Sequence, residues 1–493
     1  DVPPRFASLL NDWGAGGVLY FARNLSTPEQ TASLSDSLQR LAADAGLPPL
    51  LVAADQEGGP VTRISWGADP PSAMAMGATA DGELLAEMGT AIGGELQALG
   101  INLDFAPVLD VNVNPENPVI GVRSFGDDPS LVGRLGSQFA AGLQRADVLA
   151  CGKHFPGHGD TVTDSHHELP VLPHDRERLD RIELAPFGRA IDDGIEAVMT
   201  THVAFPAVTG VSDRPATVAP SVVTGLLRDD LGFEGLVVTD CLEMDAIVSG
   251  IGTVEAAVQA LEAGCDLLTV SHTPKQQRAA MQAVLDAVRT GRLSEARIDE
   301  SVERILSAKQ TVAAQEADAP GWEAAADRVA DAAARAASEA VTLVRDREGA
   351  LPLEGPVTVV TFDSASTSPV SDGLDSAGLG AAVDSLDCPV THRTGEVIAD
   401  DAETVVVGTT DATTNEEQVR VVRELAASDA RLVVVALSTP YDLRAFPEIP
   451  CYLTTYGDSD ALMAALGRVL RGESSAEGEL PISIPLPDSP DAN

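Results

Sequence analysis

Residues 148–170 read VLACGKHFPGHGDTVTDSHHELP and join a short apolar run to a long polar loop. The run Val148–His154 has the length and apolar composition of a buried β-strand, and it ends in Lys153 and His154. Glycine, proline and aspartate recur in the residues that follow, so we expect an irregular loop there. A polar loop after an apolar strand is typical of the βα units that build a parallel sheet, and the stretch therefore indicates an α/β fold.

Similar apolar runs recur through the first 310 residues, each followed by a helical stretch; they are Gly17–Phe21, Leu50–Ala54, Asn102–Leu109, Ala197–His202, Leu236–Asp240 and Asp266–Val270. Apolar strands that alternate with helices predict a parallel sheet with both faces covered. Polar residues stand at the ends of several runs, namely Asp55, Asp110, His154, His202 and Asp240. Because a barrel builds its active site at the carboxyl ends of many strands, this pattern favours a TIM-type (β/α)8 barrel over a doubly wound sheet.

The barrel prediction leaves one strand unaccounted for, because the seven runs are one short of a regular barrel. A helix-like segment, Phe6–Trp13, directly precedes the first run. We therefore expect the missing strand to be strand one, upstream of Asp1. A naturally open barrel is the alternative.

A change in pattern near residue 313 predicts a second domain. We expect a barrel domain over residues 1–312, an alanine-rich linker helix over 313–335 and a smaller α/β sandwich domain over 336–493. The predicted strands of the second domain are Val357–Phe362, Thr404–Gly408, Leu432–Leu437, Cys451–Thr455 and an edge strand at Leu480–Pro485, with helices at Asn415–Ala427 and Ser459–Leu470. Because no GxGxxG sequence follows a strand, nucleotide binding is not indicated.

The charge of the chain excludes several classes of partner. Its 75 Asp and Glu residues exceed its 32 Lys and Arg residues by 43. We therefore expect no nucleic-acid partner and no docking to an anionic membrane, since both need a basic surface. Only 3 of the basic residues are lysines, whereas 44 of the acidic residues are aspartates. This bias resembles that of proteins from salt-rich cytoplasm; a GC-rich genome would explain the scarcity of lysine but not the net charge.

The apolar runs and the cysteines indicate the compartment of the protein and the state of its thiols. No apolar run approaches 18 residues and no signal peptide is visible, so we expect a cytoplasmic protein without a transmembrane helix, although a leader before Asp1 could have been removed. The cysteines are Cys151, Cys241, Cys265, Cys388 and Cys451. Their scattered positions indicate small core residues and argue against a disulfide framework or a zinc ribbon.

The loop after Lys153 is rich in groups that can move protons or bind metals, and five of the eight histidines lie between His154 and His174. A metal site is one interpretation, since the loop offers His158, Asp160, Asp164, His166 and His167. A glycine-rich loop without a helical HExxH arrangement is a poor cage, however, so we predict no metal; a purely structural loop is a second interpretation. The third is an acid/base dyad. Asp164 and His166 are two residues apart, so in an extended segment they point to the same side, where the carboxylate can orient one ring nitrogen and raise the basicity of the other.

Three other stretches carry candidate functional residues. In Asp55–Arg63, a carboxylate, a glycine turn and an arginine suit recognition of neighbouring hydroxyls, although an ordinary βα loop has the same composition. Arg123 lies in a glycine-flanked loop and could equally form a surface ion pair. Asp240 follows the buried strand LVVT. It could cap a helix or pair with a core arginine, or act as the nucleophile of a retaining glycosidase.

The stretch KHFPGHGDTVTDSHHELP resembles the signature of glycoside hydrolase family 3, in its β-N-acetylhexosaminidase (β-N-acetylglucosaminidase) branch. Other segments similar to the family are DQEGG with Arg63, FAPVLDVN, IGVRSFG, VVTD before CLEMDAI, LVVVALSTPYDL, YLTTYG and EGELPISIP. The resemblance therefore covers essentially the whole chain. Pro60 departs from it, because many members carry Arg after the two glycines.

The resemblance implies a retaining exo-glycosidase that removes terminal, non-reducing β-linked N-acetylglucosamine from small or oligosaccharide substrates. Asp240 stands at the family's nucleophile position, His166 at that of the acid/base of this branch, and Asp164 at that of its dyad partner. Sugar-binding positions are matched by Asp55, Arg63, Arg123, Lys153 and His154, and His202 is a further pocket residue. The implied double displacement needs no metal or organic cofactor.

Three alternatives remain open at this point. A neutral histidine base does not repel an anionic acceptor, so a phosphorylase that uses phosphate in place of water is chemically reasonable. A β-glucosidase of the same family is a second alternative, but such enzymes typically take their acid/base carboxylate from outside this loop. A non-catalytic glycan-binding protein is the third; the joint presence of Asp240, His166 and Asp164 argues against it.

Overall fold

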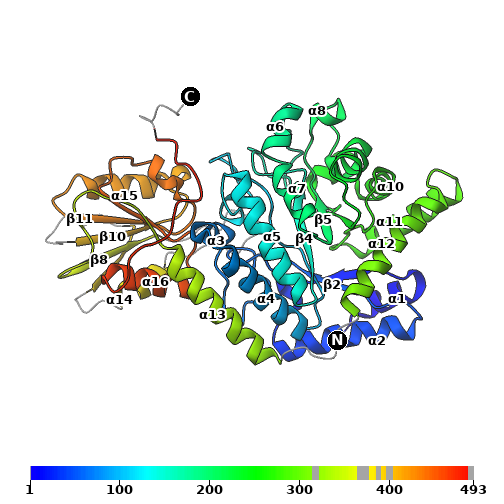
Figure 1. The fold of residues 1–493 in the computed structure, drawn as a ribbon, viewed down its shortest axis with the longest axis horizontal. Helices are drawn as coiled ribbons and strands as arrows, with labels where there is room; N and C mark the ends of the chain where they lie inside the picture. Colours follow the sequence, from blue (N-terminus) through cyan, green and yellow to red (C-terminus); the bar gives the residue numbers. More distant parts are fainter. Residues whose placement is uncertain (1, 314–320, 363–376, 385–389, 396–403, 487–493) are drawn as a thin grey trace.

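The computed structural model of the 493-residue chain describes residues 2–313, 321–362, 377–384, 390–395 and 404–486. Figure 1 shows two lobes, a larger one formed by the N-terminal part of the chain and a smaller one formed by the C-terminal part. Helix α13 (Trp322–Ala340) runs between them and contacts α3 and α4 of the larger lobe and α16 of the smaller. The predicted domain boundaries remain predictions, and part of the predicted linker, residues 314–320, lies outside the described residues.

A six-stranded parallel sheet forms the centre of the larger lobe and confirms the predicted α/β class. Its strands pair in chain order: β1 (Gly17–Leu19), β2 (Leu51–Ala54), β3 (Leu103–Asp104), β4 (Leu149–Phe155), β5 (Ala197–Thr200) and β6 (Leu236–Thr239). Strands β2 and β4 are buried along their whole length, as a sheet covered on both faces requires.

The predicted seventh strand, Asp266–Val270, is not a strand in the structure. Leu267 forms only an isolated parallel bridge with Val238. Further on, the backbone N–H of Thr269 donates to the side-chain hydroxyl of Thr239, at 2.9 Å, where a strand would use a backbone carbonyl. The run is apolar enough for a strand, but the Thr239 side chain accepts the hydrogen bond that a backbone carbonyl of β6 would accept in a regular sheet.

Helices surround this sheet and begin at recognisable caps. They are α1 (Pro4–Trp13), α2 (Pro28–Asp44), α3 (Ala73–Thr79), α4 (Gly82–Ala98), α5 (Pro129–Arg145), α6 (Arg176–Arg181), α7 (Ala185–Asp192), α8 (Pro206–Thr209), α9 (Asp245–Val248), α10 (Thr253–Ala263), α11 (Pro274–Arg289) and α12 (Glu295–Ala313). Asp81 and Asp128 accept hydrogen bonds from the first backbone N–H groups of α4 and α5. These two helices cross closely because Gly89 of α4 and Gly142 of α5 face the other's backbone, where a Cβ would collide with a carbonyl oxygen.

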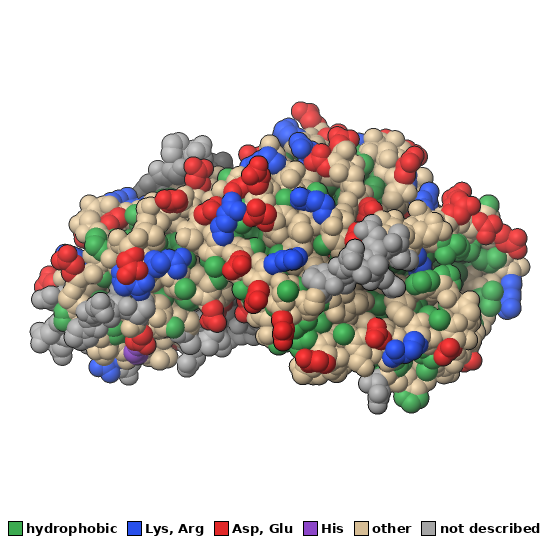
Figure 2. Space-filling view, turned by 60° about the horizontal axis from the view of Figure 1, so that its bottom comes forward, with side chains coloured by type: hydrophobic (Ala, Val, Ile, Leu, Met, Phe, Trp, Pro, Cys, Tyr) green, Lys and Arg blue, Asp and Glu red, His purple; other side chains and the backbone are tan. Residues whose placement is uncertain are grey.

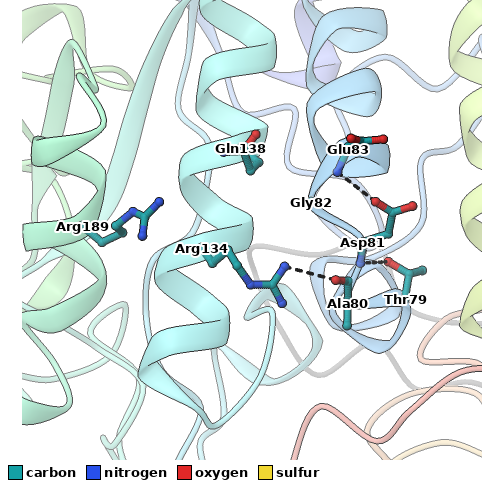
Figure 3. A pocket seen from close by; sticks show the side chains of 8 residues that line it. All are labelled: Thr79, Ala80, Asp81, Gly82, Glu83, Arg134, Gln138 and Arg189. Carbon is teal, nitrogen blue, oxygen red and sulfur yellow. Dashed lines mark hydrogen bonds between the residues drawn. The ribbon is translucent and has the colours of Figure 1, made fainter.

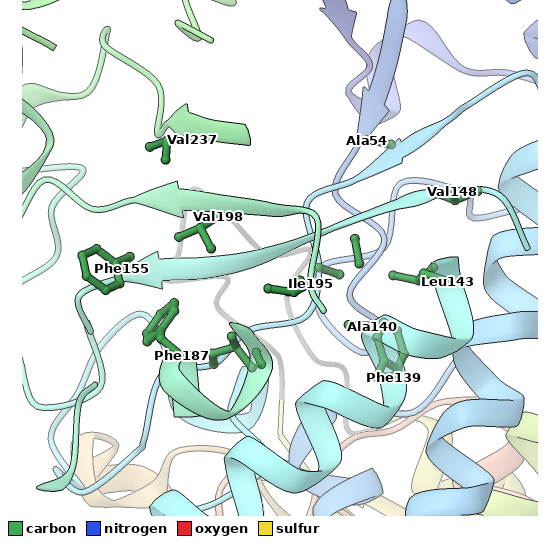
Figure 4. Packing of buried hydrophobic residues seen from close by; sticks show 14 of the residues in the cluster. Ala54, Phe139, Ala140, Leu143, Val148, Phe155, Phe187, Ile195, Val198 and Val237 are labelled. Carbon is green, nitrogen blue, oxygen red and sulfur yellow. The ribbon is translucent and has the colours of Figure 1, made fainter. Parts of the chain in front are cut away.

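The core of the larger lobe lies between the sheet and these helices. In Figure 4, Phe155 at the end of β4 packs against Phe187 of α7, and their rings meet edge to face with centroids 5.2 Å apart. Leu143 and Phe139 of α5 lie in the same cluster. This packing fixes the carboxyl end of β4, from which the long loop of residues 156–174 departs.

The smaller lobe is built on a mixed sheet with the order β7-β12-β11-β10-β8-β9. Its strands are β7 (Thr342–Asp346), β8 (Val357–Thr361), β9 (Val390–Thr394), β10 (Thr404–Thr409), β11 (Arg431–Ala436) and β12 (Cys451–Thr454), and its helices are α14 (Ala377–Asp384), α15 (Glu416–Ala426) and α16 (Asp460–Leu470). Among the described strands, β7 alone is antiparallel to its neighbour. Helix α15 packs in one apolar cluster with the sheet and α14 and α16 in another, so both faces are covered.

The prediction of an edge strand at Leu480–Pro485 is wrong, because this segment forms no strand. The two edges of the sheet are occupied by β7 and β9, which the sequence analysis missed. Part of the segment pairs instead with Asp127 of the larger lobe: the carbonyl of Pro481 accepts from its backbone N–H at 3.0 Å, and the N–H of Ser483 donates to its carboxylate at 2.6 Å. The C-terminal segment thus attaches one lobe to the other.

The lobes also share apolar and polar contacts. Met74 and Ala75 of α3 belong to the same buried cluster as Val433 of β11. The hydroxyl of Ser72 donates to the backbone carbonyl of Tyr456 at 2.7 Å. These contacts bring the second lobe against the loops at the carboxyl ends of the parallel sheet.

The surface carries the excess of acidic residues. Figure 2 shows Asp and Glu side chains spread over the displayed face, with Lys and Arg side chains among them. Within the described residues, no helix is long and apolar enough to cross a membrane. The described cysteines, Cys151, Cys241, Cys265 and Cys451, are free thiols, and Cys388 lies outside the described residues.

Candidate active site

Five of the predicted site residues come from the carboxyl ends of four strands of the parallel sheet. Asp55 directly follows β2, Lys153 and His154 lie near the end of β4, His202 follows β5, and Asp240 directly follows β6. Parallel strands place their carboxyl ends at one edge of the sheet, so these residues converge although they are far apart in sequence.

Lys153 is the centre of a buried ion cluster. Its side chain is 2 % exposed, and Nζ lies 2.8 Å from Oδ1 of Asp55 and 2.6 Å from Oε1 of Glu57. Arg123 forms a two-pronged pair with Glu57, with both N–O distances at 2.8 Å. Burial alone would raise the pKa of Glu57, but the charges of Arg123 and Lys153 lower it below its usual range. The paired carboxylate holds both cations in fixed positions.

The loop that begins at Asp55 also holds Arg63 near the cluster. Its NH2 atom lies 3.6 Å from Oδ2 of Asp55, and its backbone N–H donates to the side chain of Gln56 at 2.9 Å. Gly58 and Gly59 both have positive φ, which lets the chain turn back within this short loop. Pro60, the departure from the family pattern, follows this turn and leaves the Arg63–Asp55 contact in place.

Asp104, at the end of β3, lies beneath the ion cluster. Its carboxyl is fully buried and accepts a hydrogen bond from the backbone N–H of Gln56 at 2.9 Å. Burial raises the pKa of Asp104 well above its usual value. Burial therefore favours the neutral form of this carboxyl beside Asp55 and Glu57.

Asp110 organises the two histidines that flank the turn after β4. Its Oδ2 atom accepts from Nδ1 of His154 at 2.7 Å, and its Oδ1 atom accepts from the backbone N–H of His158 at 2.7 Å. Burial would raise the pKa of Asp110, but His154 and His158 lower it, so the group stays ionised. The bond to Nδ1 turns Nε2 of His154 toward Arg123, whose NH2 atom is 3.5 Å away.

Asp240 is held as a carboxylate by the loop that it begins. Its Oδ1 atom accepts a hydrogen bond from the backbone N–H of Cys241 at 2.6 Å. Burial would raise the pKa of Asp240, but its interactions with His202, His154 and His166 lower it. An ionised carboxylate beside these rings can attack an electrophilic carbon.

His202 supports the same loop from below. It is fully buried, Nε2 donates to the backbone carbonyl of Cys241 at 2.9 Å, and Nδ1 lies 2.9 Å from the hydroxyl of Thr217. Burial lowers the pKa of His202. Both nitrogens are thus engaged within the protein, and the ring fixes the backbone next to Asp240.

Asp164 and His166 form the predicted side-chain pair, but in a turn and not in the extended segment that we expected: the backbone N–H of His167 donates to the carbonyl of Asp164 at 3.0 Å. Oδ1 of Asp164 lies 2.6 Å from Nδ1 of His166 and also accepts the backbone N–H of His166 at 2.8 Å. The His166 side chain is 29 % exposed, and the structure gives its Nε2 atom no hydrogen-bond partner among the described residues. A partly exposed ring with Nδ1 on a carboxylate and no described partner on Nε2 can give and accept a proton.

Within the part of the chain that the structure describes, Asp160 is the only one of the five candidate ligands of the loop that belongs to a cluster able to hold a metal. Asp160, His174 and Glu183 bring one ligand atom each to within 4.8 Å of one another. The guanidinium of Arg178 already lies in this cluster, 3.1 Å from Asp160 and 3.2 Å from Glu183. An arginine therefore supplies the positive charge that the acidic groups need.

One hollow on the surface lies away from these residues. Arg134, Arg189 and the first residues of α4 line it in Figure 3, and it contains none of the predicted site residues. A second hollow lies between Pro60 and Ser72 on one side and Gly457 and Ser459 of the smaller lobe on the other. It adjoins the Arg63 loop, so the smaller lobe borders the site.

Sequence reasoning missed Glu57 and gave no role to Asp104 or Asp110. Glu57 lies in the quoted stretch DQEGG, but a glutamate before two glycines looks like a turn residue. Only the fold shows that it reaches Lys153 and Arg123.

The comparisons with known proteins agree with this geometry. A family model described as "Glycosyl hydrolase family 3 N terminal domain" matches residues 4–308. The chain is 36% identical over 330 residues to Beta-hexosaminidase A from Pseudoalteromonas piscicida, which covers 62% of this chain and 55% of that protein. It thus spans little more than half of that relative. It is 29% identical over 519 residues to the Beta-N-acetylglucosaminidase/beta-glucosidase of Cellulomonas fimi, covering 97% of this chain and 90% of that protein.

Among solved structures, the chain resembles a glycoside hydrolase family 3 beta-N-acetylglucosaminidase from Paenibacillus sp. str. FPU-7. The TM-score is 0.91 at 43% sequence identity, with 98% of this chain and 96% of that chain covered. The similarity therefore extends over both lobes.

Proposed function

This chain belongs to glycoside hydrolase family 3, and on that premise we propose that it hydrolyses terminal β-linked N-acetylglucosamine at non-reducing ends, with retention of configuration. The proposal rests on the 2.6 Å contact between Asp164 and His166. The His166 ring also interacts electrostatically with Asp240. A carboxylate nucleophile and a separate proton donor are the two groups that a retaining glycosidase needs. The relatives named as β-hexosaminidases and β-N-acetylglucosaminidases support the choice of sugar.

In the first step, a carboxylate oxygen of Asp240 attacks the anomeric carbon, and the bond from that carbon to the leaving oxygen breaks. The protonated His166 ring donates the Nε2 proton to the leaving oxygen, and the Asp164 carboxylate stabilises the imidazolium before transfer. In the second step, Nε2 accepts a proton from water as the water oxygen attacks the anomeric carbon. The bond to Asp240 breaks, which restores its carboxylate.

We propose that the buried ion cluster binds the sugar. Asp55 presents a carboxylate flanked by Lys153 and Arg63 that can accept bonds from two neighbouring hydroxyls. Arg123 and Nε2 of His154 lie beside it and can contact further polar groups of the sugar. Because salt bridges hold these side chains before substrate arrives, little ordering is needed on binding.

The test compares release of 4-nitrophenol from the N-acetyl-β-glucosaminide and the β-glucoside, with and without inorganic phosphate, and identifies the sugar product. We expect preference for the glucosaminide and free N-acetylglucosamine in both buffers. A preference for the glucoside would overturn the choice of sugar. A glycosyl phosphate product would replace hydrolysis by phosphorolysis, and unchanged turnover in Asp240→Ala would remove the catalytic role of Asp240.

A further inference from the structure

Ser165 lies between the two members of the dyad and is buried beside them. Its hydroxyl is 3.0 Å from Nε2 of His158, and Ser165 and His158 are each 2 % exposed. Asp164 and His166 bind each other, so their own hydrogen bonds do not fix the pair relative to the rest of the protein. The bond from Ser165 to His158 is a contact that can do so.

His158 is itself held firmly in the turn after β4. Its backbone N–H donates to Asp110 at 2.7 Å, its carbonyl accepts from the side chain of Asn117 at 2.9 Å, and its Nδ1 atom lies 2.8 Å from the hydroxyl of Thr161. Both ring nitrogens are therefore engaged by hydroxyl groups, which leaves neither nitrogen for a metal. Burial lowers the pKa of His158 to about 4, so its ring stays neutral over the working range of pH.

The backbone of Ser165 is anchored on the opposite side. Its carbonyl accepts a hydrogen bond from the N–H of Ala246 at 3.3 Å. Ala246 belongs to α9, which follows the loop that starts at Asp240. Ser165 is thus tied by its side chain to the loop of the sugar-binding His154 and by its backbone to the loop of Asp240.

We propose that His158 is a positioning residue that acts through the Ser165 hydroxyl to hold the Asp164–His166 pair opposite Asp240. This inference rests on the proposed function, since it assigns His158 to the proton-transfer half of the mechanism. Loss of the bond lets the pair shift as a unit, which lengthens the path from Nε2 of His166 to the leaving oxygen. Binding of the sugar depends on the ion cluster around Lys153 and is unaffected.

The test uses Ser165→Ala, His158→Phe and the double variant, with Ser137→Ala, another buried serine, as the matched control. Each is assayed on N-acetyl-β-glucosaminides with a poor leaving group (4-methylumbelliferyl) and a good one (2,4-dinitrophenyl), because only the poor one needs a well-placed acid. We expect kcat/KM to fall at least tenfold on the poor leaving group and less than threefold on the good one, with KM changed less than twofold. The double variant should lose no more than the worse single variant, and His158→Gln should recover part of the loss.

Equal losses on both leaving groups, or additive losses in the double variant, would overturn the proposal. The Ser165–His158 hydrogen bond would then only stabilise the loop. A readout that needs no substrate separates this failure from failure of the proposed function. The Nδ1 proton of His166 should give a downfield NMR signal in the wild type that exchanges with water at least tenfold faster in Ser165→Ala. An unchanged exchange rate would refute the positioning role whichever glycoside the enzyme cleaves.

Discussion

Nδ1 of His166 lies 2.6 Å from Oδ1 of Asp164, and the same oxygen also accepts the backbone N–H of His166. One carboxylate oxygen therefore sets both the direction of the ring and the backbone that carries it. Burial would raise the pKa of Asp164, but the two bonds from His166 lower it, so the carboxylate remains ionised. The carboxylate thereby favours the tautomer with a proton on Nδ1, and Nε2 is the atom that we propose exchanges protons with the substrate.

Replacing Asp164 by Asn should disable proton transfer while keeping the shape of the loop. We expect kcat to fall by roughly 10²-fold, because general acid–base catalysis typically contributes that much or more. The measurement is steady-state kinetics on an aryl N-acetyl-β-glucosaminide. The control is Asp384→Asn, which breaks the 2.7 Å contact of another Asp–His pair in the smaller lobe. Equal activity of Asp164→Asn and wild type would remove the dyad from the mechanism.

The buried pairing of Glu57 with Lys153 and Arg123 predicts a combined effect on stability and binding. Glu57→Gln leaves two buried cations without their shared partner, so we expect the free energy of unfolding to fall by about 3 kcal/mol. KM should rise at the same time, because Lys153 and Arg123 lose their fixed positions. Urea unfolding and substrate saturation curves measure the two effects, with the exposed Glu448→Gln as control. Wild-type stability together with an unchanged KM would show that Glu57 does not position Lys153 and Arg123.

Much of the fold and the dyad could be predicted from local sequence. The apolar runs located β1 to β6. The contact of Asp164 with His166 was predicted for an extended segment, but it forms within a turn. The prediction of a strand at Asp266–Val270 was wrong because a strand also needs backbone pairing with its neighbour. Beside β6, the Thr239 side chain replaces one of the backbone hydrogen bonds that this pairing requires. Glu57, and the bond from His158 to Ser165, could not be foreseen, because their partners are set by how separate loops pack against one another. Strand β7 follows α13 almost directly, so no turn signal marked its start.

The contact between the lobes predicts that the smaller lobe influences the site. The Asn112 side chain donates to the hydroxyl of Tyr441 at 3.3 Å, and Asn112 lies two residues after Asp110, which binds His154. Tyr441→Phe should cost about 1 kcal/mol of stability, the typical worth of one hydrogen bond, and raise KM measurably. Tyr452→Phe loses a 3.1 Å bond within the smaller lobe and should lower stability alone. Identical kinetics in the two variants would contradict this coupling.

Because the Glu95 carboxyl is buried, we expect the free energy of unfolding to fall as pH rises. The residue is fully buried, neither carboxylate oxygen has a hydrogen-bond partner among the described residues, and burial raises its pKa to about 8. The folded chain therefore keeps a proton that the unfolded chain loses above roughly pH 4.3, so this contribution to stability is complete below that pH and is lost on approaching pH 8. Glu95→Gln should exceed the wild type in unfolding free energy by about 2 to 4 kcal/mol at pH 8.5, with the gap shrinking toward pH 5. A gap that does not depend on pH would refute the shift.

The excess of 43 negative charges predicts a dependence on salt. Repulsion among the spread acidic side chains should weaken as salt shortens the Debye length to about 3 Å at 1 M. We expect the melting temperature and the activity to rise from dilute buffer toward molar KCl. Maximum stability in dilute buffer would contradict the interpretation of the chain as halophilic and would leave the glycosidase proposal intact.

The most direct test of the central claim is to trap the glycosyl-enzyme. The protein is incubated with a fluorinated N-acetylglucosaminyl fluoride that slows the second step, and the labelled peptide is identified by mass spectrometry. We expect one sugar per chain, attached to Asp240, and slower labelling in His166→Ala only when the leaving group needs protonation. A label on another carboxylate, or no label on an enzyme that still turns over N-acetylglucosaminides, would contradict a double displacement through Asp240.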